Sequence, residues 1–284
     1  MKKSLLQFSI FLLCCLTSWA SEKYSVSSPN GSVTLNLLKS DKDNLSYEVI
    51  FKNKNVILPS ALGFKLSKPK IIANEFSIVK IDSSVIDETW KPVWGEQSLI
   101  RNNCKELEAT VKTKSTNIII KIVFRVFNEG VGFRYEFPSQ ENLNHFIIAD
   151  ELTQFNMTGD HKVFWIPGDY DSNEFAYTTS LLSGIDASGS GKVQEIFAKC
   201  PIADNAVQTP LMMKSKEGIY INIHEAALKN YPAMNLLLNK SSFSFSTQLV
   251  PDAVGNKAYL QTPSFTPWRT IIFSDKAKIG RAHV

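Results

Sequence analysis

A histidine and a glutamate stand side by side, as His224 and Glu225, at the end of a segment with strand-like alternation. Ile219, Ile221 and Ile223 occupy every second position before them, which predicts one buried face of a strand. A carboxylate at the end of such a strand is held by a rigid element, and its hard oxygen atoms suit a divalent cation. The local pattern alone favours a solvated Glu225, because most single glutamates are exposed. The alternation places His224 opposite Ile223, where it is either a ligand contact or a hydrogen-bonded structural imidazole.

Two aspartates, Asp169 and Asp171, follow Pro167-Gly168 in an expected turn. Paired carboxylates can act as general acid and base, but in turns they commonly accept hydrogen bonds from backbone amides. We therefore predict a structural role for this pair. Trp165 comes just before the turn, and its ring face is the best placed of the tryptophans for stacking on a ligand. A place in the hydrophobic core or at an interface with a further domain is the alternative for Trp165.

The amino-terminal residues predict export. Lys2 and Lys3 precede an apolar run over residues 5–16, and small residues then lead to Ala20, so we expect a signal peptide over residues 1–20 that is cleaved after Ala20. The run is too short for a comfortable membrane span. The residue before Cys14 is leucine, which argues against a lipoprotein signal. We expect a soluble, exported, periplasmic protein.

The last six residues, 279–284, resemble a translation of short-read sequencing adapter DNA, so we leave them out of the fold prediction. On this interpretation the natural protein continues beyond Lys278; a natural short tail is the alternative. Of 31 basic residues, three lie in the two excluded ends, which leaves 28 against 27 acidic residues. This near-neutral balance argues against a nucleic-acid or membrane-surface partner.

Two cysteines, Cys104 and Cys200, remain after signal cleavage, which is too few for a disulfide scaffold over residues 21–278. They either form one bridge or stay unpaired. The sequence contains no Gly-rich phosphate loop, Cys/His zinc spacing or nucleophile elbow.

Alternation of period two recurs along the whole chain and predicts an all-β fold. The clearest case is residues 118–137, where two alternating runs flank Asn128-Glu129-Gly130 and predict a long hairpin. So many strands joined by short turns favour two large, mostly antiparallel packed sheets. Shorter strands are expected at residues 33–37, 47–51, 76–81, 107–111, 146–148, 163–166, 211–213, 219–223, 234–238 and 243–249.

Five stretches of the sequence carry a family resemblance. They are Asp87 to Glu96 (DETWKPVWGE), Phe127 to Phe137 (FNEGVGFRYEF), Phe164 to Asp171 (FWIPGDYD), Ile221 to Leu228 (INIHEAAL), and the pair LQTP and TPWRT within residues 260–270. In this order and spacing they resemble the amino-terminal domain of glycoside hydrolase family 97, whose members include exported α-glucosidases and α-galactosidases of Bacteroidetes type.

This resemblance implies a β-super-sandwich like that of galactose mutarotase, followed in the parent protein by a catalytic (β/α)8 barrel. The domain is expected to span residues 21–278, and we leave open that its last strand lies beyond them. The resemblance places the catalytic carboxylates in the barrel, so we name no catalytic residue here. We expect this chain to be inactive alone, and its parent to hydrolyse O-glycosyl bonds of α-linked oligosaccharides.

The resemblance also implies one metal ligand. In the family, a glutamate of this domain joins barrel glutamates around a Ca²⁺ ion, and Glu225 is the matching position. We expect calcium binding by the full-length enzyme and weak or no binding by this chain. Trp165 and His224 are the candidate substrate contacts.

Two other functions stay open at this stage. The same sandwich is suited to a free-standing carbohydrate-binding module. An aldose epimerase is the other, because His145, His161, His224 and Glu225 are acid/base residue types, although fold analogy is a weak argument for it.

Overall fold

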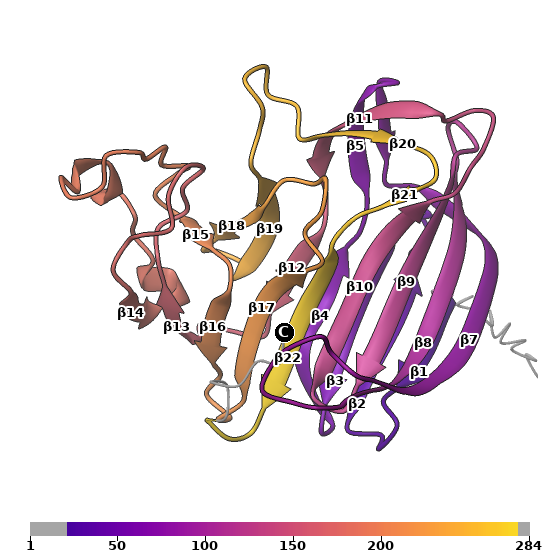
Figure 1. Ribbon diagram of the computed structural model, residues 1–284, viewed down its shortest axis with the longest axis horizontal. Helices are drawn as coiled ribbons and strands as arrows, with labels where there is room; N and C mark the ends of the chain where they lie inside the picture. The colour runs from indigo at the N-terminus through magenta and orange to yellow at the C-terminus, as the bar shows by residue number, and fades with distance from the viewer. Residues whose placement is uncertain (1–21, 278–284) are drawn as a thin grey trace, which may run out of the picture.

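The computed structural model describes residues 22–277, which form strands, turns and two short 3-10 helices (Figure 1). The expected signal peptide and the foreign-looking residues 279–284 lie outside these described residues. Within 22–277, no helix combines the length and apolar character needed to cross a bilayer. The prediction of an all-β sandwich with large antiparallel sheets is confirmed.

One large sheet has eight strands in the order β1-β2-β3-β4-β12-β19-β18-β15. All its neighbouring strands are antiparallel. Its strands are β1 (Glu22–Ser27), β2 (Val33–Lys39), β3 (Leu45–Phe51), β4 (Lys54–Ala61), β12 (Gln154–Met157), β19 (Ser244–Leu249), β18 (Met234–Asn239) and β15 (Ala206–Gln208).

The second large sheet has ten strands, nine of them in the order β14-β13-β16-β17-β22-β10-β9-β8-β7, with β21 paired to β10. Figure 1 shows its strands β17, β22, β10, β9, β8 and β7 side by side across the view. Its members are β14 (Thr178–Leu181), β13 (Lys162–Trp165), β16 (Leu211–Lys214), β17 (Tyr220–Ala226), β22 (Trp268–Ser274), β10 (Gly130–Phe137), β9 (Ile119–Phe127), β8 (Ile100–Thr113), β7 (Phe76–Trp90) and β21 (Ser264–Phe265).

A third, four-stranded sheet was not expected from the sequence. It has the order β20-β11-β5-β6 and lies at the top of Figure 1. Its strands are β20 (Ala258–Gln261), β11 (His145–Glu151), β5 (Phe64–Lys68) and β6 (Ile71–Ala73).

One extended apolar cluster joins the sheets. Tyr47 of β3 packs against Phe133 of β10, with 4.8 Å between ring centroids, so the two large sheets face each other. Phe64 of β5 meets Tyr135 of β10 at 4.5 Å in an edge-on contact, so the small sheet closes one end of the same core. Such tilted contacts add to the stabilisation that comes from burying the rings.

The predicted hairpin over residues 118–137 forms as β9 and β10, with its aromatic residues facing the core. Gly130 opens β10 and pairs with Phe127, so the turn itself is Asn128-Glu129. A Cβ atom on Gly130 would lie 2.4 Å from the carbonyl oxygen of Ile271 in β22. Glycine is therefore needed where these two backbones approach each other.

The hairpin of β7 and β8 is much longer than the sequence pattern indicates. It begins at the predicted strand near Phe76 but continues to Trp90 before the chain returns from Ile100. Residues beyond Ser83 in β7 are largely exposed, so no buried face imposes alternation on them. The tip carries large exposed side chains, among them Trp90, Val93 and Trp94.

A long connection over residues 166–205 adds β14 and the 3-10 helices η1 (Leu182–Gly184) and η2 (Ser190–Lys192). It packs on a small apolar cluster of its own, made by Ile166, Phe175 and Ile196.

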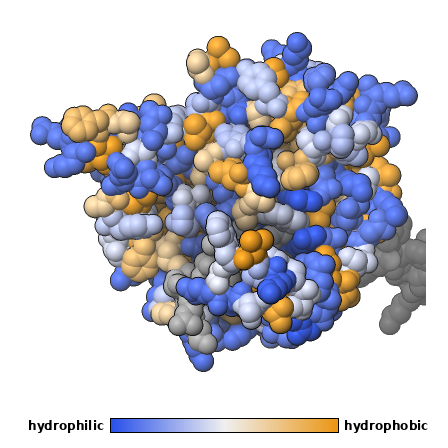
Figure 2. Space-filling view, viewed as in Figure 1, coloured by the Kyte–Doolittle hydropathy of each residue, from blue (hydrophilic) through white to orange (hydrophobic). Residues whose placement is uncertain are grey.

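In the space-filling view of Figure 2, apolar side chains occur on the visible face as separate spots between hydrophilic ones.

Candidate functional site

Glu225 lies next to the end of β17, as predicted, and its neighbours at alternate positions, Ile221 and Ile223, are fully buried. Its own side chain belongs to this inward series and is 7% exposed. β17 pairs with β22, where the residue opposite Glu225 is Arg269. Arg269 shares the inward side with Ile271 and Phe273 and is completely buried. The sheet register therefore brings a buried carboxylate and a buried guanidinium together.

Arg269 joins two glutamates. Its Nη1 atom donates to Glu225 Oε2 at 2.7 Å. Its Nε and Nη2 atoms donate to the two oxygens of Glu151 at 3.0 and 2.7 Å, in the forked geometry that matches guanidinium to carboxylate. The Tyr231 hydroxyl donates to Glu151 Oε2 at 2.9 Å, and the backbone amide of Met234 donates to Glu225 Oε1 at 3.0 Å. We call Glu151, Arg269, Glu225 and Tyr231 the buried ion cluster.

The buried ion cluster connects all three sheets. Glu151 ends β11 of the small sheet, whereas Arg269 and Glu225 belong to the ten-stranded sheet. The Met234 amide that binds Glu225 opens β18 of the eight-stranded sheet. Burying these charges is costly, and the cost is offset only because each is paired and hydrogen-bonded.

The protonation states in the buried ion cluster follow from its geometry. Burial alone lowers the pKa of Arg269, but the charge and hydrogen bonds of Glu151 raise it, and the net result lies above the ordinary arginine value. Arg269 therefore stays charged. Burial, followed by the charge of Glu151, raises the pKa of Tyr231 well above its ordinary value. Tyr231 therefore acts as a neutral hydrogen-bond donor.

This arrangement limits what Glu225 can do. Each of its oxygens accepts a hydrogen bond from within the domain, and a full positive charge lies beside it. A Ca²⁺ ion needs six to eight oxygen ligands and would be repelled by Arg269. No group of three or more histidine, cysteine or acidic residues in the described part of the chain could hold a metal ion. As placed, Glu225 does not fit a calcium site, and its role as a ligand stays a prediction.

His224 lies on the opposite side of β17 from Glu225, as predicted, and is half-buried. Its Nδ1 atom is buried and makes no hydrogen bond. Burial lowers the pKa of His224, and the nearby Glu225 charge opposes this shift only in part. His224 is therefore a neutral imidazole near neutral pH with one unused ring nitrogen.

Trp165 does not join His224 in a common site. Its side chain is 4% exposed and belongs to the main core cluster, while its Nε1 atom donates to Ser180 Oγ at 3.0 Å. A ring in this position has no free face on which a sugar can stack. The prediction of a substrate contact at Trp165 is therefore replaced by the alternative of a core residue.

The turn after Trp165 has the predicted structural role. Asp169 Oδ1 accepts hydrogen bonds from the backbone amides of Asp171, Ser172 and Cys200, at 2.8–3.0 Å. Asp169 thereby ties the start of the 166–205 connection to its end.

Cys200 is exposed, Cys104 is buried, and both are unpaired, which settles the choice between a bridge and free thiols.

The residue types that favoured an epimerase are not gathered into one group. His145 is exposed on β11, and His161 is buried just before β13. Neither joins His224 in a group of three or more potential metal-ligating side chains within residues 22–277. Sequence reasoning overlooked Arg269, although its position in the same alternating series as Ile271 and Phe273 signalled a buried charge.

Comparisons with known proteins agree with the fold. Residues 26–279 match the family model described as Glycosyl-hydrolase 97 N-terminal. A retaining alpha-galactosidase of Bacteroides thetaiotaomicron is 22% identical over 261 residues, which cover 88% of this chain and 35% of that protein.

Solved structures show the same relation. A glycoside hydrolase family 97 enzyme from Pseudoalteromonas sp. strain K8, in complex with acarbose, matches with a TM-score of 0.77 and 31% identity over 89% of this chain and 36% of its own. A beta-arabinopyranosidase matches with a TM-score of 0.73 at 16% identity, over 89% of this chain and 40% of its own, and so shares the fold. The chain thus spans little more than a third of the length of these relatives.

Proposed function

Because this chain belongs to the glycosyl-hydrolase 97 N-terminal family, we propose that it is the non-catalytic amino-terminal domain of an exported α-glycosidase. The observation that carries the proposal is the family match over nearly the whole described chain, combined with coverage of only 35% and 36% of an α-galactosidase and of the acarbose-bound enzyme. In this proposal the remainder of the parent protein holds a (β/α)8 barrel with the catalytic carboxylates. The substrate is an α-linked oligosaccharide.

The chemistry of the domain supports a non-catalytic role. Glycoside hydrolysis uses two carboxylates flanking the glycosidic bond, one of which must be able to give up a proton. The buried ion cluster contains two carboxylates, Glu151 and Glu225, but Arg269 binds both of them. Neither is open to a substrate, because their side chains are 0% and 7% exposed.

Exposed apolar residues support packing against a further domain. At the tip of the β7–β8 hairpin, Val93 is fully exposed, Trp94 is 89% exposed and Trp90 is 51% exposed. Clusters of exposed large apolar side chains are uncommon on isolated soluble domains and often mark interaction sites. We propose that this tip contacts the barrel of the parent protein.

Calcium binding through Glu225 is a proposal for the full-length enzyme with one structural requirement. The carboxylate would have to exchange Arg269 or the Met234 amide for the ion when the barrel packs on the domain. Calorimetric titration of calcium into the full-length protein and its Glu225→Gln variant tests this directly. Equal affinity in the two proteins would remove Glu225 from the ligand set.

Hydrolysis assays test the main proposal. The purified chain is expected to leave p-nitrophenyl α-glucoside and p-nitrophenyl α-galactoside intact, whereas the full-length protein is expected to cleave at least one of them. Cleavage by the chain alone, or by neither protein, would contradict the proposal. Export is tested by sequencing the amino terminus of the secreted protein, which is expected to begin at Ser21.

A further inference from the structure

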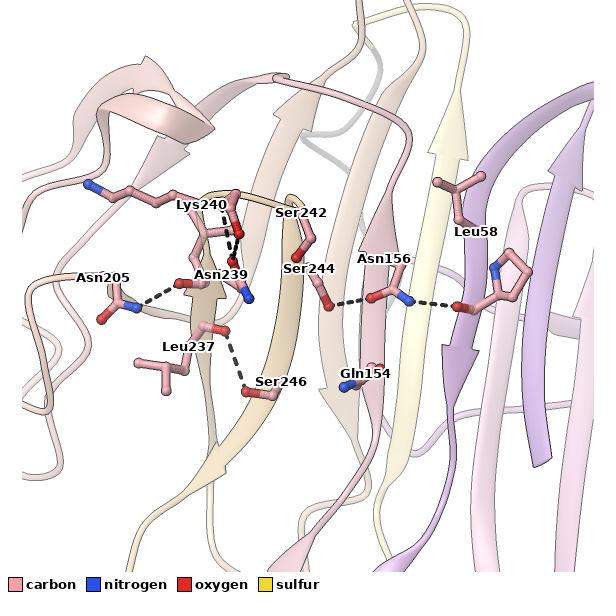
Figure 3. Close-up of a pocket in the computed structure, with 13 residues that line it drawn as sticks. Leu58, Gln154, Asn156, Asn205, Leu237, Asn239, Lys240, Ser242, Ser244 and Ser246 are labelled. Carbon is pink, nitrogen blue, oxygen red and sulfur yellow. Dashed lines mark hydrogen bonds between the residues drawn. The ribbon is translucent and has the colours of Figure 1, made fainter. Parts of the chain in front are cut away.

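A broad groove crosses the outer face of the eight-stranded sheet. It has a volume of about 1150 Å³ and runs over β4, β12, β19 and β18, with the turn between β18 and β19 at one end. Figure 3 shows Asn156, Asn205, Ser244 and Ser246 along it, with Lys240 extending from the turn. It is far larger than a site for one ion or water molecule, and it somewhat exceeds the range of about 300–1,000 Å³ that is usual for small-molecule sites.

The groove has an unusual composition for a solvated surface. Lys240 is its one charged residue among thirteen, and most of the others carry amides or hydroxyls. Solvated sheet faces are usually rich in charged residues. The ten-stranded sheet follows this rule with three ion pairs between partly exposed side chains, namely Lys121–Glu108, Arg125–Glu106 and Arg134–Glu136. The groove therefore favours a neutral ligand that can both donate and accept hydrogen bonds.

Several groove side chains are held in fixed orientations. Asn156 Nδ2 donates to the carbonyl oxygen of Pro59 at 2.6 Å, and its Oδ1 atom accepts a hydrogen bond from Ser244. Asn205 Nδ2 donates to the carbonyl oxygen of Leu238 at 2.6 Å. Each amide keeps hydrogen-bonding capacity that these contacts do not use. Groups fixed in this way lose little entropy when they bind a ligand.

Other groove side chains are uncommitted. In the described part of the chain, Gln154 makes no side-chain hydrogen bond, although its backbone carbonyl binds Tyr47. Lys240 likewise has no ion-pair partner within residues 22–277. Leu58 of β4 and Leu237 of β18 lie on opposite sides of the groove and supply apolar surface. Hydroxyl groups alternating with C–H surface are the chemistry of a sugar chain, and the groove offers complementary groups for both.

We propose that this groove binds a neutral oligosaccharide, as a second carbohydrate site built entirely from this domain. The inference rests on the proposed function, because the parent protein would then act on α-linked oligosaccharides. Its role would be to hold a remote part of a long substrate or a glycan chain. Binding would depend on hydrogen bonds from Gln154, Asn156, Asn205 and Lys240 and on aliphatic contact with Leu58 and Leu237.

Calorimetric titration of the purified chain with maltoheptaose, and separately with stachyose, tests the proposal. At least one sugar is expected to bind. The double variant Gln154→Ala/Lys240→Ala removes two side chains that make no hydrogen bond or ion pair within residues 22–277. It is expected to bind about tenfold more weakly, as the loss of two hydrogen bonds predicts. The control is Asn103→Ala, which removes an amide from β8 of the other large sheet and is expected to leave the affinity unchanged.

The outcomes separate this inference from the proposed function. The groove site would be overturned if neither sugar bound to the chain, or if the double variant and the control bound the sugar with equal affinity. The proposal would also be overturned if the double variant bound sugar as tightly as the parent chain but bound the separately produced remainder of the protein more weakly. The groove would then be a contact between domains. Hydrolysis of p-nitrophenyl glycosides by the full-length protein does not depend on the groove, so it reports on the proposed function alone.

Discussion

Replacing Arg269 by methionine tests the buried ion cluster. The variant keeps an unbranched, flexible side chain of broadly similar reach but removes three hydrogen bonds, one to Glu225 and two to Glu151. Two carboxylates would then remain inside the protein with Tyr231 and one backbone amide as their donors. Loss of one partner from a buried ion pair typically costs about 3–5 kcal/mol, because the remaining charge is uncompensated.

This loss is large on the scale of the whole domain. Natural domains are stable by about 5–15 kcal/mol, so the variant would lose at least about a fifth of the stability of such a domain. For a domain of about 150–250 residues, each kcal/mol lowers the unfolding midpoint by about 2–4 °C. Arg269→Met is therefore expected to lower the midpoint by about 6–20 °C, measured by circular dichroism with heating.

A matched control separates burial from simple loss of an arginine. Arg101 binds Asp87 through Nε and Nη2, at 2.7 Å each, in the same forked geometry but on the exposed β7–β8 hairpin. Arg101→Met is expected to unfold at nearly the parent temperature, because exposed ion pairs are screened by water. Equal midpoints for Arg101→Met and Arg269→Met would refute the reasoning. Addition of Glu151→Gln and Glu225→Gln to Arg269→Met is expected to restore part of the loss, since no unpaired charge would remain.

Three further predictions concern other parts of the fold. Iodoacetamide is expected to label Cys200 in the native protein and Cys104 only after unfolding, because Cys104 is buried and burial raises the pKa of its thiol. Peptide mass mapping identifies the labelled cysteine, and labelling of Cys104 in the native protein would contradict the prediction. Burial lowers the pKa of His161 below 6.5, so the neutral imidazole stabilises the fold above pH 6.5, and this stabilisation is lost as the pH falls through the lowered pKa. As the pH falls from 6.5 through that pKa, the unfolding midpoint of His161→Gln should therefore fall less steeply than that of the parent protein. Gly130→Ala is expected to destabilise the domain by about 1–3 kcal/mol in urea, because the added methyl group would meet the Ile271 carbonyl, and an unchanged urea midpoint would contradict that contact.

The sequence predicted the parts of the fold where one face is buried and the other is wet. The β9–β10 hairpin is the clearest example, because its inward residues alternate without interruption and its turn is short. The outer half of β7 escaped prediction because both of its faces are exposed, so no hydrophobic period marks it. The four-stranded sheet was also missed, since its strands come from distant parts of the chain and three of them are short.

The predictions for the site residues depended on different kinds of structural information. The position of Glu225 at the end of a strand followed from the alternation of three isoleucines. Its partner could not be deduced in this way, because the pairing of Glu225 with Arg269 depends on the register of two strands more than forty residues apart. The prediction for Trp165 failed for a related reason: a turn that follows a residue says nothing about which face of the strand its ring occupies.

The buried ion cluster also explains why a charged group is placed where an apolar one would be stable. Apolar replacement of a buried ion pair is often neutral or stabilising, so stability alone does not account for Arg269. Its three directional hydrogen bonds fix β22 against Glu225 of β17 and Glu151 of β11, and Glu225 in turn fixes the start of β18. Apolar contacts tolerate small slips between sheets, whereas a forked ion pair does not. The residues that follow Glu225, from Ala226 to the Met234 amide, are thereby held at both ends, so the same cluster gives this margin of the domain a defined shape.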